Sequence, residues 1–336
     1  MGVKTIRHIF LCLAFLSAGV FPAAAQVKIS FLNRVASPFH AITGASGYDT
    51  TFIAKPSFKW KVTLRTSAKG FDVSNANTLE GVGYEAFRSS RTRLTEGVDV
   101  SFCGVKIGLG FDPQKVFAKK KFRDKSYSLI YYGNRFGIDA MLHFTPSLDG
   151  ELKKDGSWIS LPEGTISHRN LYISGYYVFN CRQFSYPAAF SQSFIQKRSA
   201  GSALAATMYS RSRFSIHPWE VLDNHETVST LRTLCLGAGY GYNFVLAKGW
   251  LLHLSAIPAL SLFSKTDSVV DGVPASGRAY SNIMLNQRFA LVKYFAKDRL
   301  FVNLTAYGIG LLALKEDRFS YAQAVWDTRL LVGVRF

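Results

Sequence analysis

Cysteine, proline and long apolar runs are all scarce in this chain of 336 residues. Its four cysteines have no close spacing, which argues against a disulfide framework and against a zinc site. With ten prolines and no repeat or low-complexity run, nothing indicates a linker, so we expect one main domain. Beyond the first 25 residues no apolar run approaches the ~18 residues of a spanning helix, which excludes membrane-spanning helices.

The first 25 residues have the pattern of a secretory signal peptide. Lys4 and Arg7 precede an apolar run at residues 9–21, and three alanines at residues 23–25 supply a small-residue cleavage site. The alternative is a single membrane anchor, but the run is shorter than the ~20 residues that a spanning helix needs. We therefore predict export and cleavage after residue 25.

The end of the chain alternates between two kinds of side chain, as a strand between two solvents would. One row is mostly apolar: Ala324, Trp326, Thr328, Leu330, Val332, Val334 and Phe336. The other row carries Gln323, Asp327, Arg329 and Arg335. A strand that ends on an aromatic carboxyl terminus resembles the closing strand of outer-membrane barrels. We predict that Val332, Val334 and Phe336 form the signal read by the barrel-assembly machinery.

The same alternation recurs along the chain, although a mean hydropathy of +0.08 conceals it because every second residue is polar. It predicts an all-β protein, a transmembrane antiparallel up-and-down barrel at residues 57–336 in the outer-membrane bilayer. About twelve strands are expected, near residues 58–65, 81–88, 97–111, 127–132, 135–144, 170–179, 184–214, 231–242, 249–263, 279–295, 300–314 and 321–336. The long stretch at 184–214 is either one strand or a strand bent or broken near residues 196–199. The apolar parity slips at Cys103 and Gly104, where we expect a β-bulge.

The expected connections alternate in length, as an outer-membrane barrel requires. Short periplasmic turns are predicted near residues 134, 180–183, 247–248 and 296–298. Long outer loops are predicted at residues 112–125, 145–168, 215–230 and 265–278. A soluble β-sandwich would show no such alternation.

Residues 26–56 are the least regular part of the chain and are expected to form a periplasmic lead-in or a plug in the barrel mouth. Gly237, Gly239 and Gly241 recur at period two within one predicted strand. We interpret them as places where the inner wall is bare and leaves room for a plug or an opposing side chain.

The predicted interior is basic. It carries three acidic residues, Asp99, Asp139 and Asp327, against seven basic ones: Lys59, Lys61, Arg65, Lys106, Arg288, Arg329 and Arg335. Such a lumen could attract anions, as rings of Lys or Arg do in anion-selective pores. Alternatively, these charges pair across a small closed interior.

An outer loop carries a second basic patch that includes Lys119, Lys120, Lys121 and Arg123. Outside the cell it would meet lipopolysaccharide phosphates. Nucleic acid is the other partner of such runs, but an exported barrel seldom meets it.

Catalytic chemistry has little support in the sequence. His253 shares the polar face of a predicted strand with Ser255, and a Ser-His pair is the beginning of a nucleophilic site. No acid or amide is placed beside the pair by spacing, so we expect a histidine in a lumenal hydrogen-bond network. His217 and the His225-Glu226 pair lack the spacing of a zinc-protease motif. We expect no enzyme, cofactor or metal.

Two stretches carry a family resemblance. They are residues 48–53, leading into Phe58, Lys59 and Trp60, and residues 176–202, within which SYPAAFSQ at 185–192 is the most specific part. Both are similar to the DUF4421 family of Gram-negative outer-membrane β-barrel proteins, a domain of unknown function. The resemblance implies a barrel and no catalytic residues.

Three functions stay open at this point. The first is passive or gated passage of small, anionic solutes. The second is a closed barrel with a structural or surface-interaction role, and the third is a lipid-modifying enzyme. A Ser-His-amide cluster on one wall would favour the third. The sequence does not give the oligomeric state.

Overall fold

The computed structural model describes residues 47–58, 60–76, 85–102, 105–111, 125–274, 278–279, 282–296, 298–313 and 320–336. The chain divides into two compact units, residues 1–42 and 43–336, and every described residue lies in the second. The predicted signal peptide, Lys59 and the loop patch Lys119, Lys120, Lys121 and Arg123 lie outside the described residues.

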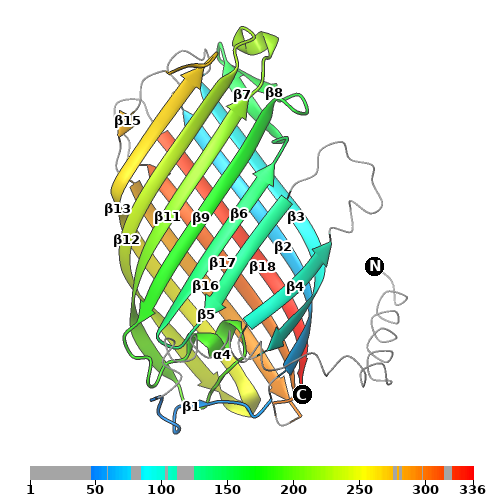
Figure 1. Cartoon of the computed structure of the whole chain (residues 1–336), viewed down its shortest axis with the longest axis vertical. Helices are drawn as coiled ribbons and strands as arrows, with labels where there is room; N and C mark the ends of the chain where they lie inside the picture. The colour runs from blue at the N-terminus through cyan, green and yellow to red at the C-terminus, as the bar shows by residue number, and fades with distance from the viewer. Residues whose placement is uncertain are drawn as a thin grey trace, which may run out of the picture. The chain divides into compact units, whose positions relative to one another are not determined.

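Twelve long strands form the wall in this part of the chain, all steeply tilted (Figure 1). They are β2 (Trp60–Ala76), β3 (Ala86–Phe102), β4 (Val105–Phe111), β5 (Lys125–Tyr132), β6 (Phe136–Thr145), β9 (Ile166–Val178), β11 (Ala200–Ile216), β12 (Thr227–Leu246), β13 (Trp250–Val270), β16 (Asn282–Phe295), β17 (Leu300–Ala313) and β18 (Ser320–Arg335). The expected all-β antiparallel class and the count of about twelve strands are confirmed.

Each wall strand pairs with its neighbour in the chain, in the order β5-β6-β9-β11-β12-β13-β16-β17-β18-β2-β3, and β4 pairs with β3. The last strand therefore lies beside the first, as an up-and-down barrel requires. At that junction Trp60 and Phe336 exchange two backbone hydrogen bonds of 3.0 and 3.1 Å. Between β4 and β5 no pairing is present among the described residues.

The two faces of the wall differ as the alternation predicts. On β18, Leu330, Val332 and Val334 are exposed, whereas Leu331 and Arg335 on the opposite face are buried. Exposed large apolar residues continue around the wall, among them Leu129, Ile173, Leu236, Leu254, Leu260, Leu304 and Leu312. A wall with an apolar outside and buried polar groups inside fits a barrel between lipid and lumen.

The predicted β-bulge at Cys103 and Gly104 is wrong. Phe102 pairs with Val105 in antiparallel register, so the chain reverses direction between them. Phe102 and Val105 share a face in such a hairpin, which produces the same parity slip as a bulge would. The predicted strands at residues 81–88 and 97–111 are therefore replaced by β3 and β4.

The strand predicted at residues 184–214 is interrupted near residues 196–199, where a bend or break was allowed. The prediction is wrong for its first half, since only the second half is the wall strand β11. Before it lie the short helix α4 (Tyr186–Phe190) and β10 (Ile195–Gln196). The predicted short turn at residues 180–183 begins this longer connection. Pro187 lies in the first turn of α4, where its missing N–H costs nothing.

The remaining elements are short. A hairpin of β7 (Gly150–Lys154) and β8 (Ser157–Ser160) extends β3, and β14 (Val273–Pro274) and β15 (Arg278–Ala279) pair with β13. The 3₁₀ turns η1 (Glu220–Leu222) and η2 (Ala247–Gly249) lie in connections. Among the described residues, no helix is long and apolar enough to cross a membrane.

Candidate functional site

The connection between β9 and β11 folds into the barrel. We call residues 180–199 the in-folded segment. All five residues of α4 are buried, as are Phe184, Ser185, Gln192 and Gln196. The helix lies at the same end of the wall as the C-terminus and β1 (Ile53–Ala54) (Figure 1). The segment therefore fills one end of the lumen.

Side chains of the wall hold this segment by its main-chain oxygens. Tyr294 Oη donates to the carbonyl of Ala188 at 3.2 Å, and Asn303 Nδ2 donates to that of Ala189 at 3.1 Å. Lys61 donates to the carbonyl of Ser191, and Arg335 donates to that of Gln192 at 2.5 Å. Two of the predicted lumenal cations, Lys61 and Arg335, thus serve as hydrogen-bond donors to the segment.

A polar relay connects the wall to Tyr186 of α4. Asn243 donates to the carbonyl of Ser185 and to Gln196 Oε1, both at 2.9 Å, so its own Oδ1 faces His253 Nδ1 at 2.7 Å. Because the Asn243 oxygen can only accept a hydrogen bond, His253 carries its proton on Nδ1. Its unprotonated Nε2 then accepts a hydrogen bond from Ser255 Oγ at 3.0 Å. Ser255 in turn lies 2.9 Å from Tyr186 Oη.

Ser255, His253 and Asn243 form a Ser-His-amide cluster. The sequence analysis identified the serine and the histidine but did not identify Asn243 as the amide. The order of the hydrogen bonds is that of a nucleophilic relay. In this structure His253 and Asn243 are fully buried beneath the in-folded segment, and Tyr186 binds the serine hydroxyl. The geometry therefore makes the relay an anchor of the segment.

Of the three glycines that were predicted to leave the inner wall bare, one lies against the in-folded segment. A Cβ on Gly241 would lie 3.2 Å from the ring of Phe184, whereas at Gly239 it would meet the backbone of Ala256 at 2.0 Å. Gly241 thus leaves room for the segment, and Gly239 allows a close strand–strand approach.

The described part of the predicted lead-in docks on the in-folded segment. Ile53 and Ala54 of β1 pair antiparallel with Gln196 and Ile195 of β10, and Ile53 is fully buried. The lead-in turns at Asp49, whose carboxylate accepts hydrogen bonds from the Thr51 hydroxyl and backbone N–H. These hydrogen bonds hold the pKa of Asp49 below its ordinary value. The lead-in therefore contacts the segment that occupies the lumen, and residues 26–46 lie outside the described residues.

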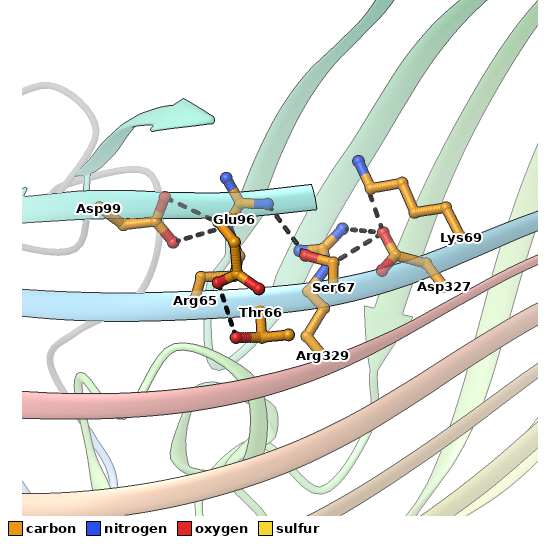
Figure 2. Close-up of polar contacts among 8 residues, drawn as sticks. All are labelled: Arg65, Thr66, Ser67, Lys69, Glu96, Asp99, Asp327 and Arg329. Atoms are coloured by element: carbon orange, nitrogen blue, oxygen red, sulfur yellow. Dashed lines mark hydrogen bonds and ion pairs between the residues drawn. The ribbon is translucent and has the colours of Figure 1, made fainter. Parts of the chain in front are cut away.

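Charged side chains line the inner face of β2, β3 and β18 (Figure 2). Arg65 lies 3.3 Å from Asp99 and donates to Ser67 at 3.0 Å. Arg329 donates to Asp327 at 2.6 and 3.0 Å, and Lys69 lies 3.8 Å from the same carboxylate. Two of the predicted lumenal arginines are thus paired with the predicted acidic residues.

A third ion pair spans the lumen. Arg288 on β16 donates to Asp139 on β6, and four strands of the wall separate the two. Both side chains are almost completely buried. Five rings surround the guanidinium at 5.0 to 6.0 Å from their centroids: Tyr132, Tyr176, Tyr186, Phe190 and Tyr307. Since two of these rings belong to α4, the ion pair and the in-folded segment form one packed unit.

Further contacts cross the lumen on the other side of this ion pair. Ser212 on β11 donates to Gln323 on β18 at 3.1 Å. The ring of His168 stacks between Phe71 and Phe214, with centroids 4.5 and 4.4 Å away. The interior of the described barrel is therefore filled at several levels. This agrees with the second alternative of the sequence analysis, in which the charges pair across a small closed interior.

A cavity of about 60 Å³ shares Lys69, Asp327 and Arg329 with the charged cluster of Figure 2. Its lining includes Lys69, Arg93, Lys125 and Arg329, one acidic residue, Asp327, and the polar residues Ser128, His143, His168, Asn170 and Tyr307. Of these, the sequence analysis singled out Arg329 and Asp327. Lys69, Arg93 and His168 were missed because the predicted strands were too short: β2, β3 and β9 extend beyond the predicted strands at residues 58–65, 81–88 and 170–179.

The remaining predicted residues are placed as follows. Val332, Val334 and Phe336 lie exposed on the outer face, and their role in assembly stays a prediction. The side chain of Lys106 lies outside the described part of the structure. Cys181 and Cys235 are free thiols. Within the described residues, no three His, Cys, Asp or Glu side chains come together as a metal site.

Comparison with solved structures finds several barrels of low identity. The outer-membrane protease OmpT from Escherichia coli is 8% identical, with a TM-score of 0.38, over 84% of this chain and 99% of OmpT. The translocator domain of the autotransporter NalP from Neisseria meningitidis is 13% identical, with a TM-score of 0.31, over 93% of this chain and 100% of that domain. The Pseudomonas putida toluene transporter TodX is 8% identical, with a TM-score of 0.19, over 88% and 93%.

The activities in these names belong to those proteins and are not assigned to this chain. No curated protein sequence is significantly similar to this chain. The family model for DUF4421, a domain of unknown function, matches residues 47–336, which include every strand described above. This protein therefore belongs to the DUF4421 family.

Proposed function

We propose that this protein is a gated outer-membrane barrel, closed at rest, whose in-folded segment leaves the lumen to admit small solutes. The exposed apolar outer face supports a place in the bilayer, because such a surface is stable in lipid and aggregates in water. The exposed aromatic terminus Phe336 supports recognition by the barrel-assembly machinery. The basic loop that contains Lys119 would then face lipopolysaccharide phosphates.

One observation carries the gate. Wall side chains hold the in-folded segment through hydrogen bonds to its carbonyl oxygens and through the packing of buried side chains such as Phe184 and Tyr186, and none of these contacts is covalent. Each neutral bond of this kind contributes a net ~0.5–1.5 kcal/mol and each bond from a charged donor ~1.5–3 kcal/mol, since water replaces them when the segment leaves. A segment held in this way can be released without unfolding the wall.

The lead-in supplies a handle for release. Lys197 N–H donates to the carbonyl of Phe52 at 2.7 Å, and Asp49 N–H donates to that of Arg182 at 2.8 Å. Displacement of the lead-in would therefore pull on both ends of the in-folded segment.

Osmotic swelling of liposomes tests the gate. Native protein should cause no more swelling in small solutes than empty liposomes. A variant in which Asn-Gly replaces residues 181–198 should cause rapid swelling, because Lys61, Tyr294 and Asn303 then face water. Heat-modifiable migration on a gel verifies that the variant is folded. A folded variant that causes no swelling would refute the gate.

A closed barrel without transport is the second candidate, and the contacts between opposite walls favour it. The Ser212–Gln323 bond and the His168 stack lie outside the in-folded segment, so its removal does not break them. The same swelling assay separates the two functions, because a folded but impermeable variant is the outcome that the closed barrel requires.

A further inference from the structure

Five cations face outward on four neighbouring strands of the wall. They are Arg169 on β9, Arg211 and Arg213 on β11, Arg232 on β12 and Lys265 on β13, and we call them the basic belt. These are all the Lys and Arg residues of the four strands, each of which is described along its whole length. We propose that the basic belt binds the phosphate groups of lipopolysaccharide. The proposal rests on the bilayer placement in the proposed function and does not depend on the gate.

Strand pairing sets the five cations side by side. Arg169 pairs with Arg213, and Arg211 pairs with Arg232, which pairs with Lys265 on the next strand. Neighbouring strands lie ~4.8 Å apart, and the two rows are separated by two residues, roughly 7 Å, along each strand. Like charges that lie directly opposite each other destabilise a sheet. The arrangement therefore favours an anion that contacts several of these cations at once.

The protein itself matches only part of this charge. Asp267, the one acidic residue of the four described strands, lies 2.9 Å from Arg232 and 2.7 Å from Lys265. The guanidinium of Arg169 lies over the ring of Phe144, 4.6 Å from its centroid. Arg211 and Arg213 are exposed, and their guanidinium groups have no hydrogen-bond or ion-pair partner among the described residues. Both are therefore available to a phosphate, of which a guanidinium can bind two oxygens at once.

An apolar row lies directly beside the belt, on the side toward the C-terminal end of the wall. It consists of residues that pair across the same four strands: Ile173, Tyr209, Leu234 and Phe263. Ile173 and Phe263 are exposed and would contact acyl chains. A ligand that covers both rows carries negative charge on its head group and apolar chains beneath it. This composition is that of a phosphorylated lipid and differs from that of a soluble anion.

The belt lies at the end of the wall that has the longer connections. Residues 217–226 join β11 to β12 there, whereas the three residues of η2 join β12 to β13 at the other end. Long connections of an outer-membrane barrel lie outside the cell, and the C-terminus and α4 lie at the opposite end (Figure 1). At that opposite end the same strands present exposed aromatic residues, Tyr177, Phe244 and Trp250, and no cation. Positive charge at the outer boundary alone fits a lipid that is confined to the outer leaflet.

Binding of fluorescently labelled lipopolysaccharide to the folded full-length protein in detergent tests the belt. Arg211→Gln combined with Arg213→Gln should weaken this binding about 25-fold, since each Lys or Arg near an anionic membrane surface contributes about a factor of five. Lys293→Gln combined with Arg299→Gln is the matched control, because it changes the net charge equally at the other end of the wall. The control should bind as the native protein does. Heat-modifiable migration on a gel verifies that both variants are folded.

Two further arms identify the ligand chemistry. Lipopolysaccharide from which the phosphates have been removed should bind at least about tenfold more weakly, since hydrogen bonds to charged groups are lost. Inorganic phosphate at the same concentration as the lipid should not displace it, because phosphate alone makes no contact with the apolar row.

Saturable binding that the Arg211 and Arg213 replacements weaken, and that depends on the lipid phosphates, supports the proposal. Absence of binding to the folded native protein overturns it, as does a folded double variant that binds as tightly as the native protein. An equal loss in the control variant would indicate general charge attraction and would also overturn the site. Displacement by inorganic phosphate would overturn the lipid as the occupant. Each of these results leaves the gate standing, because the swelling assay tests the gate separately.

Discussion

The two halves of the lumen use the same basic residue types in different ways. Around the in-folded segment, Arg288 is matched by Asp139, and Lys61 and Arg335 donate to main-chain oxygens. Around the cavity, Lys69 and Arg329 share the carboxylate of Asp327. The difference shows that a basic interior need not be one filter, because Lys61 and Arg335 hold the main chain of the in-folded segment, whereas Lys69 and Arg329 pair with a carboxylate of the wall.

Both halves depend on the junction of β18 and β2, so its loss should have the largest effect. Deleting Phe336 removes the two backbone hydrogen bonds with Trp60 and the exposed terminal ring. We expect a secreted but unassembled chain, detected by loss of heat-modifiable migration on a gel. If the deletion variant still migrates as a folded barrel, the closing strand does not depend on its terminus.

The ion pair across the lumen provides the next largest effect. Asp139→Asn leaves Arg288 buried without its charge partner, which should lower the free energy of unfolding by roughly 3–5 kcal/mol. Asp99→Asn is the matched control, and its loss should be smaller because Arg65 is more exposed than Arg288. Denaturant unfolding in lipid vesicles measures both. Equal losses would mean that the two halves are not distinguished by burial.

A third prediction concerns the outer face, which the two halves share. Leu304→Arg, in the exposed row of β17, should cost roughly 2–4 kcal/mol near the middle of the bilayer. Leu300→Arg, at the end of the same row, should cost about 0–1 kcal/mol because it lies near the interface. Vesicle unfolding again measures the difference, and equal costs would argue against a bilayer around this wall.

The smallest effect is expected at the relay. Ser255→Ala removes hydrogen bonds to His253 and Tyr186 and should destabilise the barrel by about 1 kcal/mol. A fluorophosphonate probe, which reacts with nucleophilic serines, should leave the native protein unlabelled because Tyr186 binds the hydroxyl. Labelling of the native protein that Ser255→Ala abolishes would instead indicate a hydrolytic site.

The sequence could predict the wall because alternation is local. A strand between lipid and lumen requires period two along its own residues, and Leu330, Val332 and Val334 show it without reference to any partner. The error at Cys103 and Gly104 arose because a tight hairpin and a β-bulge both shift the apolar alternation by one residue.

The lumen could not be predicted because its contacts join strands that are distant in the chain. Nothing near Arg288 indicates that Asp139 lies opposite, and nothing near Lys69 indicates His168. Residues 184–190 combine aromatic and small side chains that suit either a strand or a buried helix. The choice between a strand and a buried helix depends on the lumen, into which these residues pack.

Single-channel recording in a planar bilayer tests the central claim, closure by the in-folded segment, most directly. Native protein should stay closed. Asn243→Ala combined with Asn303→Ala removes donors to the segment and should give discrete openings in a barrel that still migrates as folded. Steady conductance by the native protein, or a folded double variant that never opens, would contradict the claim.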